Sequence, residues 1–207
     1  MRCIGIIGAM DDEVAELKEY MQDVKVTTIA SMDFYEGILE NHKAVVVQSG
    51  IGKVNAAICA QILIDRFQAE VVINTGIAGS LNNEINIGDI VVSTDLVQHD
   101  VNALAFGYAR GQIPDMEQFS FQSDEVLRKL AVRACREVNP EIEVFEGRIA
   151  SGDQFVADQD VKDLIVKEFG AYAVEMEGGA IAQTAVLNHV PFLVIRAISD
   201  KADGSAH

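Results

Sequence analysis

Two glutamates lie close together in the otherwise apolar and glycine-rich stretch at residues 171–182, AYAVEMEGGAIA. A strand here would point Glu175 and Glu177 toward one side and Met176 toward the other. An ionised carboxylate is rarely buried without hydrogen-bond donors, a cation or a ligand. A glycine pair follows directly, where the backbone can turn or approach another molecule closely. The stretch therefore predicts a binding site, although a buried strand whose acids meet helix N-termini or surface water would show the same pattern.

Further carboxylates follow other predicted strands. Glu13 comes shortly after a strand at residues 3–9, and Asp200 follows a strand at residues 192–198, with Arg196 four positions earlier. If these strands are parallel neighbours, the acids and the arginine converge at one edge of a sheet, where open α/β sheets bind ligands. Carboxylates in different environments can divide into a protonated acid and an ionised base, the pair that glycosidic-bond chemistry requires. The simpler interpretation of Glu13 is an acid that suits the first turn of a helix.

Several common motifs are incomplete in this sequence. Residues 50–55, GIGKVN, resemble a dinucleotide fingerprint, but the third glycine is Asn55 and the next predicted strand does not end in an acid. Lys53 is followed by valine, so the Ser or Thr of a P-loop is missing. What remains is a glycine turn that either approaches a small ligand or only connects a strand to a helix. Because the histidines lack ligand spacing and there is no G-x-S-x-G, we expect no metal, no cofactor and no serine triad.

The composition excludes several classes of partner. Sixteen basic and thirty-two acidic residues give a net charge of −16 over 207 residues, which repels nucleic acid and anionic membranes. Cys3, Cys59 and Cys135 are far apart and form no CxxC, which favours reduced thiols in a cytoplasmic protein. Neither a signal peptide nor a membrane-spanning run is apparent, so we expect a soluble chain with one domain over residues 1–207.

Strands and helices alternate along the chain, which indicates an α/β fold with a mixed sheet. Residues 99–121 show no clear periodicity, and so long a segment is usually functional or at an interface. The expected strands are residues 3–9, 24–31, 34–40, 43–48, 71–74, 89–97, 143–149, 171–176 and 192–198. The expected helices are residues 11–21, 54–67, 160–169 and 180–189, together with one that Ser123 caps and that ends near Val138.

Ordered blocks along nearly the whole chain resemble the nucleoside phosphorylase and nucleosidase superfamily, and within it the bacterial 5′-methylthioadenosine/S-adenosylhomocysteine nucleosidases. The blocks are GIIGAMDDEV (5–14), SGIGKVNAA (49–57), INTGIAGS (73–80), GDIVVS (88–93), HDVNALAFGYARGQIP (99–114), SGDQF (151–155), VEMEGGAIA (174–182) and RAISD (196–200). The resemblance implies a three-layer α/β/α sandwich with a central mixed β-sheet. It also implies a homodimer that hydrolyses the N-glycosidic bond of both nucleosides, releasing adenine and a 5′-thio-ribose for methionine salvage and the recycling of methylation by-products.

The resemblance also implies roles for individual residues. Glu13 would take a proton from the attacking water, positioned by Arg196 and Glu177, and Glu177 would bind the ribose hydroxyls. Asp200, held by Ser199, would donate a proton toward adenine N7.

Further residues would shape the substrate pocket. Met176 would pack on the sugar, Phe155 would stack on the purine and the Val156 backbone would read its edge. Other lining residues would be Ala9, Met10, Ile51, Gly79 and Glu175. Ala103, Phe106 and Pro114 would reach across the dimer to close the alkylthio pocket of the partner subunit.

Two alternative functions fit the sequence less well. A purine nucleoside phosphorylase usually places arginines in its first loop and after the VVIN strand, and neither loop has one here. A non-catalytic adenosine-binding domain would be expected to lose Glu13 or Asp200, and both are present.

The chain also departs from the family pattern. Ile77 replaces a frequent serine, and Ala103-Leu104 replaces a Val-Thr pair, which would alter the pocket. The sequence stops at His207, before the C-terminal helix that covers the site in relatives. We expect a chain that truly ends there to bind substrate poorly.

Overall fold

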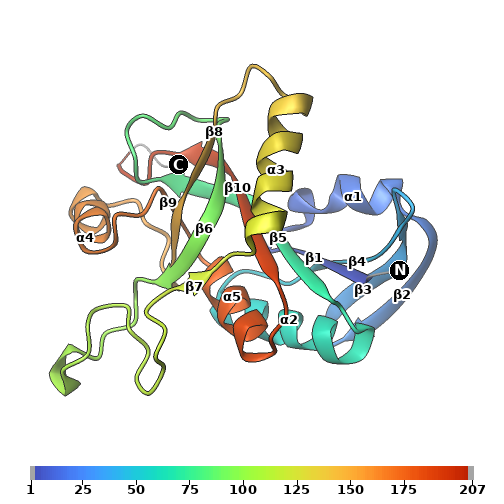
Figure 1. Cartoon of the computed structure of the whole chain (residues 1–207), viewed down its shortest axis with the longest axis horizontal. Helices are drawn as coiled ribbons and strands as arrows, with labels where there is room; N and C mark the ends of the chain where they lie inside the picture. The colour runs from blue at the N-terminus through green and yellow to red at the C-terminus, as the bar shows by residue number, and fades with distance from the viewer. Residues whose placement is uncertain (1–2, 205–207) are drawn as a thin grey trace.

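The computed structural model describes residues 3–204, which form a curved sheet with helices packed against it (Figure 1). The two ends of the predicted domain, residues 1–2 and residues 205–207, lie outside the described part. The strands are β1 (Cys3–Gly8), β2 (Gln22–Ile29), β3 (Met32–Leu39), β4 (His42–Gln48), β5 (Val71–Ser80), β6 (Ile90–Gln98), β7 (Phe121–Gln122), β8 (Val144–Ser151), β9 (Ala173–Glu175) and β10 (Phe192–Asp200). The α-helices are α1 (Ala15–Tyr20), α2 (Lys53–Phe67), α3 (Glu125–Val138), α4 (Gln159–Phe169) and α5 (Gly178–Leu187), and two 3₁₀ turns are η1 (Asp11–Glu13) and η2 (Leu104–Phe106).

The sheet is mixed, as predicted. Strand β1 runs parallel to both β4 and β5, and β5 runs parallel to β10, so the carboxyl ends of β10, β5, β1 and β4 meet at one edge. The hairpins β2–β3 and β3–β4 are antiparallel and extend the sheet beyond β4. At the other side, β10 also pairs with β6, so that β5, β9, β8, β6 and β10 close into a ring. The four parallel carboxyl ends are where the site is built.

Alternate residues of the strands face different helices, which gives the layers their order. Ile7 packs in the core beneath α2 and α5, whereas its neighbour Ile6 packs with Val14 beside α1. Val91 lies in the first core, and Val92 packs with Val132 of α3 on the opposite face. Both faces of the sheet are therefore covered, which fits the three-layer arrangement expected from the sequence.

Several predicted elements have different bounds in the structure. The helix expected at residues 11–21 is broken, because η1 ends at Glu13 and Val14 (φ −130°) separates it from α1. The break lets the Glu13 carboxylate fold back onto the end of β1. Asp124, not Ser123, caps α3 by accepting from the Leu127 amide at 2.9 Å.

The region around the glutamate pair differs most from its prediction. The strand expected at residues 171–176 is limited to β9, which is parallel to β8 but antiparallel to β5. Glu177 lies beyond the strand, at the start of α5, so its position is set by the strand-to-helix turn and not by strand alternation. Strand β5 extends six residues past the predicted end at Asn74, to Ser80, and this extension pairs with β9.

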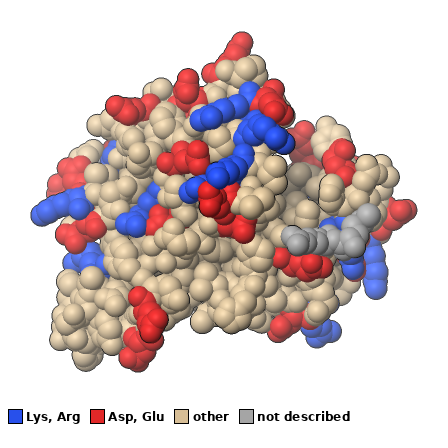
Figure 2. All heavy atoms as spheres, in the orientation of Figure 1, with Lys and Arg blue, Asp and Glu red and all other residues tan. Residues whose placement is uncertain are grey.

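Charge is distributed unevenly over the visible face. Acidic side chains are scattered widely, and basic side chains gather over α3 (Figure 2). Within residues 3–204, no helix combines the length and apolar character needed to cross a membrane.

Candidate active site

A cavity of about 280 Å³ lies across the carboxyl ends of β10, β5, β1 and β4. It is where the sequence predicted that separated acids would converge. Its lining includes twelve of the thirteen residues expected in one subunit's site, namely Ala9, Met10, Glu13, Ile51, Gly79, Phe155, Glu175, Met176, Glu177, Arg196, Ser199 and Asp200. Ile77, Ala78 and Val174 complete it.

A buried arginine holds the centre of the cavity. The Arg196 side chain is only 1% exposed and points its guanidinium at three carboxylates. Nη2 forms an ion pair with Glu175 and lies 3.5 Å from Oε2 of Glu177, while Nη1 lies 4.0 Å from Oε1 of Glu13. Nη2 also donates to Asn74 Oδ1 at 2.6 Å. One cation therefore faces three acids, which leaves an excess of negative charge at the cavity floor.

Glu13 is held by the backbone at the end of β1. Its Oε2 accepts from the amides of Ala9 at 2.6 Å and Met10 at 3.0 Å, and its Oε1 accepts from Ile77 at 3.0 Å. Three N–H donors from two neighbouring strands fix the plane of the carboxylate. A carboxylate oriented in this way beside a cavity can accept a proton from a bound water.

Glu177 is the acid whose titration is most perturbed. Burial is the main cause that raises its pKa to about 7, with repulsion from Glu175 next, while Arg196 and the hydrogen bond from Gly52 oppose the shift. The Gly52 amide donates to Glu177 Oε1 at 2.9 Å, so the glycine turn before α2 reaches directly into the site. A carboxyl group of this kind exchanges a proton near neutral pH, which is typical of functional sites.

Glu175 differs from the other acids because its oxygens are already occupied. Its Oε2 accepts from the amides of Glu177 at 3.0 Å and Gly178 at 2.7 Å, besides the ion pair with Arg196. Its Oε1 accepts from the Ser151 hydroxyl. A carboxylate offers about four acceptor positions, so Glu175 is positioned to orient Arg196 and the turn into α5.

Asp200 lies at the rim, at the end of β10. The Ser199 hydroxyl donates to its Oδ2 at 2.7 Å, and the Ala202 amide donates to its Oδ1 at 2.7 Å. Ser199 also reaches the Ala78 carbonyl at 3.3 Å, which ties the pair to β5. The Asp200 carboxyl is thereby fixed at the opposite end of the cavity from Met10 and Ile51, which lie at the ends of β1 and β4.

The walls are apolar at both ends. Phe155 is 65% exposed beside Asp200, and Ile51 is 54% exposed beside Met10. Val156 does not line the main cavity; it lines an adjoining hollow of about 30 Å³ together with Phe155 and Asp200.

The three residues expected to serve a partner subunit lie away from this cavity. Ala103, Phe106 and Pro114 belong to the segment between β6 and β7, which projects from the body of the molecule at the lower left of Figure 1. Phe106 is 83% exposed, whereas Ala103 is buried. Residues 99–120 contain only the short turn η2, as the lack of periodicity predicted.

Four residues that support the site were not assigned a role from the sequence. Asn74 bridges Arg196 and the Ile7 carbonyl (2.9 Å), and Ser151 joins Glu175 to the Gly179 amide at 2.6 Å. A side chain at Gly76 would place its Cβ 2.4 Å from both Arg196 Nη1 and Glu13 Oε1, so only glycine lets these groups meet there. Gly52 is the fourth. Asn74 could have been found from the sequence, because a polar residue at the end of a buried strand needs hydrogen-bond partners.

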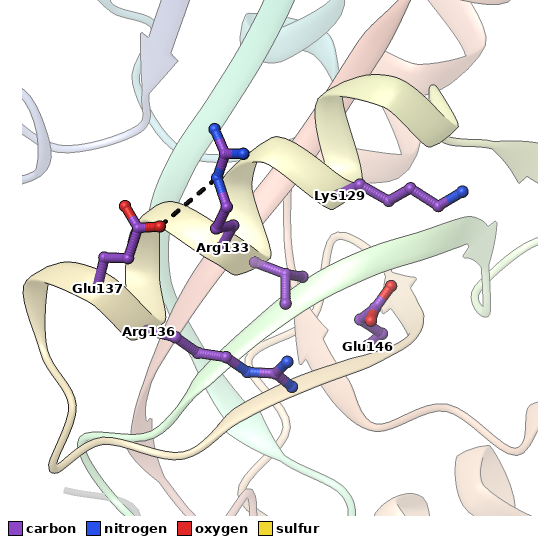
Figure 3. A pocket seen from close by; sticks show the side chains of 6 residues that line it. Lys129, Arg133, Arg136, Glu137 and Glu146 are labelled. Carbon is purple, nitrogen blue, oxygen red and sulfur yellow. Dashed lines mark ion pairs between the residues drawn. The ribbon is translucent and has the colours of Figure 1, made fainter.

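A second hollow, of about 330 Å³, lies between α3 and β8 and lacks such features (Figure 3). Arg133 in its lining forms an ion pair with Glu137 at 3.6 Å, one turn along α3, with both side chains about 70% exposed. Glu146 is paired with Arg128 at 3.1 Å. Exposed pairs of this kind are ordinary surface features, so the cavity around Arg196 is the candidate active site.

Comparisons with known proteins agree with this assignment. The sequence profile described as the Phosphorylase superfamily matches residues 3–207. The 5′-methylthioadenosine/S-adenosylhomocysteine nucleosidase of Staphylococcus haemolyticus is 47% identical over 204 residues, covering 98% of this chain and 88% of that protein. The crystal structure of the Neisseria meningitidis enzyme of that name, in complex with methylthio-immucillin-A, superposes with a TM-score of 0.96 at 43% identity, covering 100% of this chain and 89% of that one. Futalosine hydrolase of Helicobacter pylori superposes with a TM-score of 0.93 at 38% identity, covering 99% and 87%.

Proposed function

Since the chain belongs to the phosphorylase superfamily, and within it to the 5′-methylthioadenosine/S-adenosylhomocysteine nucleosidases, we propose that the Arg196 cavity is where it cleaves both nucleosides. The reaction is hydrolysis of the N-glycosidic bond, which yields adenine and the 5′-thio-ribose. The observation that carries the assignment of the site is the convergence of Glu13, Glu177 and Asp200 on one cavity.

The proposed chemistry follows from the two ends of the cavity. Asp200 donates a proton to N7 of adenine as the bond between N9 and C1′ breaks, so that the base leaves neutral. The donors from Ser199 and Ala202 then stabilise the carboxylate that remains. Phe155, beside Asp200, provides an apolar face for the purine, and the Val156 backbone borders the adjoining hollow.

The sugar is proposed to lie over the carboxylates. Positive charge develops on the ribosyl group as the bond breaks, and the excess of acids around Arg196 stabilises it at a cavity floor where Arg196, Glu175 and Glu177 are buried. Glu13 takes a proton from the water that attacks C1′, and Glu177 binds the ribose hydroxyls with Met176 packed on the ring. Met10 and Ile51, at the end of the cavity away from Asp200, contact the 5′-thio group.

Water, not phosphate, is the nucleophile that this cavity suits. A phosphate dianion needs free cationic donors. Arg196 is the one cation among the described residues of the lining, and its Nη atoms already contact Glu13, Glu175, Glu177 and Asn74. The phosphorylase alternative is therefore not favoured, and the presence of both Glu13 and Asp200 in the cavity disfavours a non-catalytic domain.

We also propose that the protein is a homodimer, that it is cytoplasmic and that it serves methionine salvage. A homodimer is supported by the projecting segment with Phe106, which would close the 5′-thio pocket of the partner subunit together with Ala103 and Pro114. The three cysteines are free thiols, which supports a cytoplasmic location. Release of a 5′-thio-ribose supports a role in methionine salvage.

The decisive experiment measures adenine release by the native protein and by Asp200→Asn in phosphate-free buffer. Loss of the acid should lower kcat by about 10²- to 10⁴-fold, and the half-buried side chain should leave the fold intact. Asp160→Asn, exposed in the first turn of α4, is the matched control and should retain activity. A native enzyme that requires phosphate, or an Asp200→Asn variant with normal turnover, would contradict the proposal.

A further inference from the structure

A polar hollow of about 340 Å³ lies beside the active-site cavity and has no part in the mechanism above. Residues from η1 and α1, from the turn between β2 and β3 and from the end of β4 line it. Its charged groups are Asp11, Lys18 and Asp33. It therefore carries both signs of charge, unlike the apolar wall of Met10 and Ile51 next to it.

The two hollows adjoin along the edge of the sheet. Met10 lines the active-site cavity and Asp11 lines the polar hollow, while Ile51 lines the cavity and Gly50 lines the hollow. The strand order β10, β5, β1, β4, β3 places Asp200 at one end, the carboxylates in the middle, Met10 and Ile51 next, and Asp33 at the far end. A ligand that extends past Met10 and Ile51 in this direction enters the polar hollow.

Lys18 is the basic side chain of this hollow, and two neighbours hold it in place. Its Nζ donates to Asp11 Oδ1 at 2.8 Å and lies 4.9 Å from the centre of the Tyr35 ring. The Lys18 side chain is 15% exposed and that of Asp11 is 66% exposed, so the lysine is fixed while its partner is largely in water. An ammonium group has three N–H donors, so Lys18 can bind a further anion without leaving Asp11.

A cation can be bound at the same place. Asp33 accepts one hydrogen bond from the Thr28 hydroxyl, at 2.5 Å, and a carboxylate can accept about four. With Asp11, two carboxylates and one ammonium line a single hollow. This pattern of charge matches a zwitterion, an amino acid's α-carboxylate and α-ammonium groups.

We propose that this hollow binds the amino-acid end of S-adenosylhomocysteine, with Lys18 contacting the α-carboxylate and Asp33, assisted by Asp11, contacting the α-ammonium group. The inference rests on the proposed function, because the sulfur must lie beside Met10 and Ile51. In the homocysteine portion, two methylene groups join that sulfur to the Cα that bears the carboxylate and the ammonium group, whereas 5′-methylthioadenosine ends at a methyl group. The hollow then distinguishes the two substrates, while the chemistry at C1′ is common to both.

The test compares kcat/KM for the two nucleosides in Lys18→Met, which keeps most of the length of the side chain and removes its charge. The value for S-adenosylhomocysteine should fall about fivefold or more, since a half-exposed charge pair contributes modestly. The value for 5′-methylthioadenosine should stay within about twofold. Lys43→Met is the matched control, because Lys43 pairs with Glu36 at 2.9 Å at the opposite end of β4, and it should change neither value.

A second comparison separates this inference from a structural effect of the substitution. An analogue of S-adenosylhomocysteine without its carboxylate should be cleaved equally by the native protein and by Lys18→Met. Equal loss for both natural nucleosides, or no loss for either, would overturn the inference. No adenine release from either nucleoside by the native protein would overturn the proposed function, and the inference with it.

Discussion

At the scale of single residues, the site is organised by an imbalance of charge. Three carboxylates share one buried guanidinium, and repulsion among them is reduced when one acid keeps its proton. Glu177 takes that role because it is buried and has Glu175 as its nearest acidic neighbour in sequence. Its pKa of about 7 means that the cluster changes charge near neutral pH. A developing sugar cation would favour loss of this proton, so the site can respond to its own reaction.

The same shift makes a prediction about stability. An acid whose pKa is about 7 in the folded protein and 4.5 in the unfolded chain binds more protons when folded between these values. The free energy of unfolding should therefore fall as the pH rises from about 4.5 to 7. In Glu177→Gln this decline should be smaller, by an amount on the order of 2 kcal/mol. Urea denaturation at pH 5, 6, 7 and 8 measures it.

A control is needed because other acids titrate in the same range. Glu137→Gln removes a carboxylate that is 69% exposed on α3, and its curve should follow that of the native protein. Parallel pH dependences for Glu177→Gln and the native protein would show that the Glu177 proton is not held by the fold.

At the scale of elements, the glycine turn between β4 and α2 connects the cavity to distant parts of the chain. The Gly52 amide donates to Glu177, and the Lys53 amide donates to Asp153 Oδ1 at 2.8 Å. The Lys53 ammonium pairs with Asp100 Oδ1 at 2.7 Å, at the base of the projecting segment. Asp100 in turn accepts from the Asp153 amide at 2.9 Å. This turn therefore fixes the position of the Glu177 carboxylate relative to the loops that carry Asp100 and Asp153.

Gly52→Ala should disturb this alignment. The residue has φ of +96°, and a Cβ there would lie 3.0 Å from Asp153 Oδ1. We expect a loss of about 1–2 kcal/mol in stability from the backbone strain and a fall of at least about tenfold in kcat/KM, because the amide bound to Glu177 moves. Adenine release and thermal unfolding measure the two effects.

Gly88→Ala is the matched control for this prediction. Gly88 has a similar φ of +94°, but a Cβ there would meet nothing within 4 Å. It should lose a similar amount of stability and keep its activity. If both variants kept their activity, the turn would have no role in positioning Glu177.

The sequence predicts most of the elements, but it does not predict their bounds near the site. Apolar runs and glycine turns located most strands, and the rule that parallel strands bring their carboxyl ends together predicted that Glu13, Arg196 and Asp200 would meet. The bounds near the acids were wrong, because tertiary contacts override local pattern there. The Glu13 carboxylate must reach the amides of Ala9 and Met10, and this breaks the expected helix.

Partnerships between distant residues could not be read from the sequence. Strand alternation treated Glu175 and Glu177 as equivalent, but one is saturated by Ser151, Arg196 and backbone amides while the other faces the cavity. The need for glycine at Gly76 depends on two side chains from other strands.

At the scale of the whole molecule, the proposed dimer depends on the segment between β6 and β7. It projects from the body of the fold and carries Phe106 and Leu104, which are 83% and 49% exposed. Large exposed apolar side chains on a projecting segment are typical of contact surfaces. Ile51, which lines the cavity beside Met10, is also exposed. A partner's apolar residues would cover Ile51 and leave the polar hollow of Lys18 open to the ligand.

This arrangement predicts that two inactive variants restore each other. Phe106→Asp should lose most of its activity because each subunit lacks the partner's apolar residue, and Asp200→Asn should lose it because the proton donor is gone. In a heterodimer of the two, the subunit with Phe106→Asp keeps its own Asp200 and receives Phe106 from its partner. Heterodimers isolated through two different affinity tags should therefore regain about half of the native activity, since one of two sites is intact. Activity no higher than the mean of the two parent variants would show that Phe106 serves its own subunit or neither, and the proposed exchange across the dimer would fail.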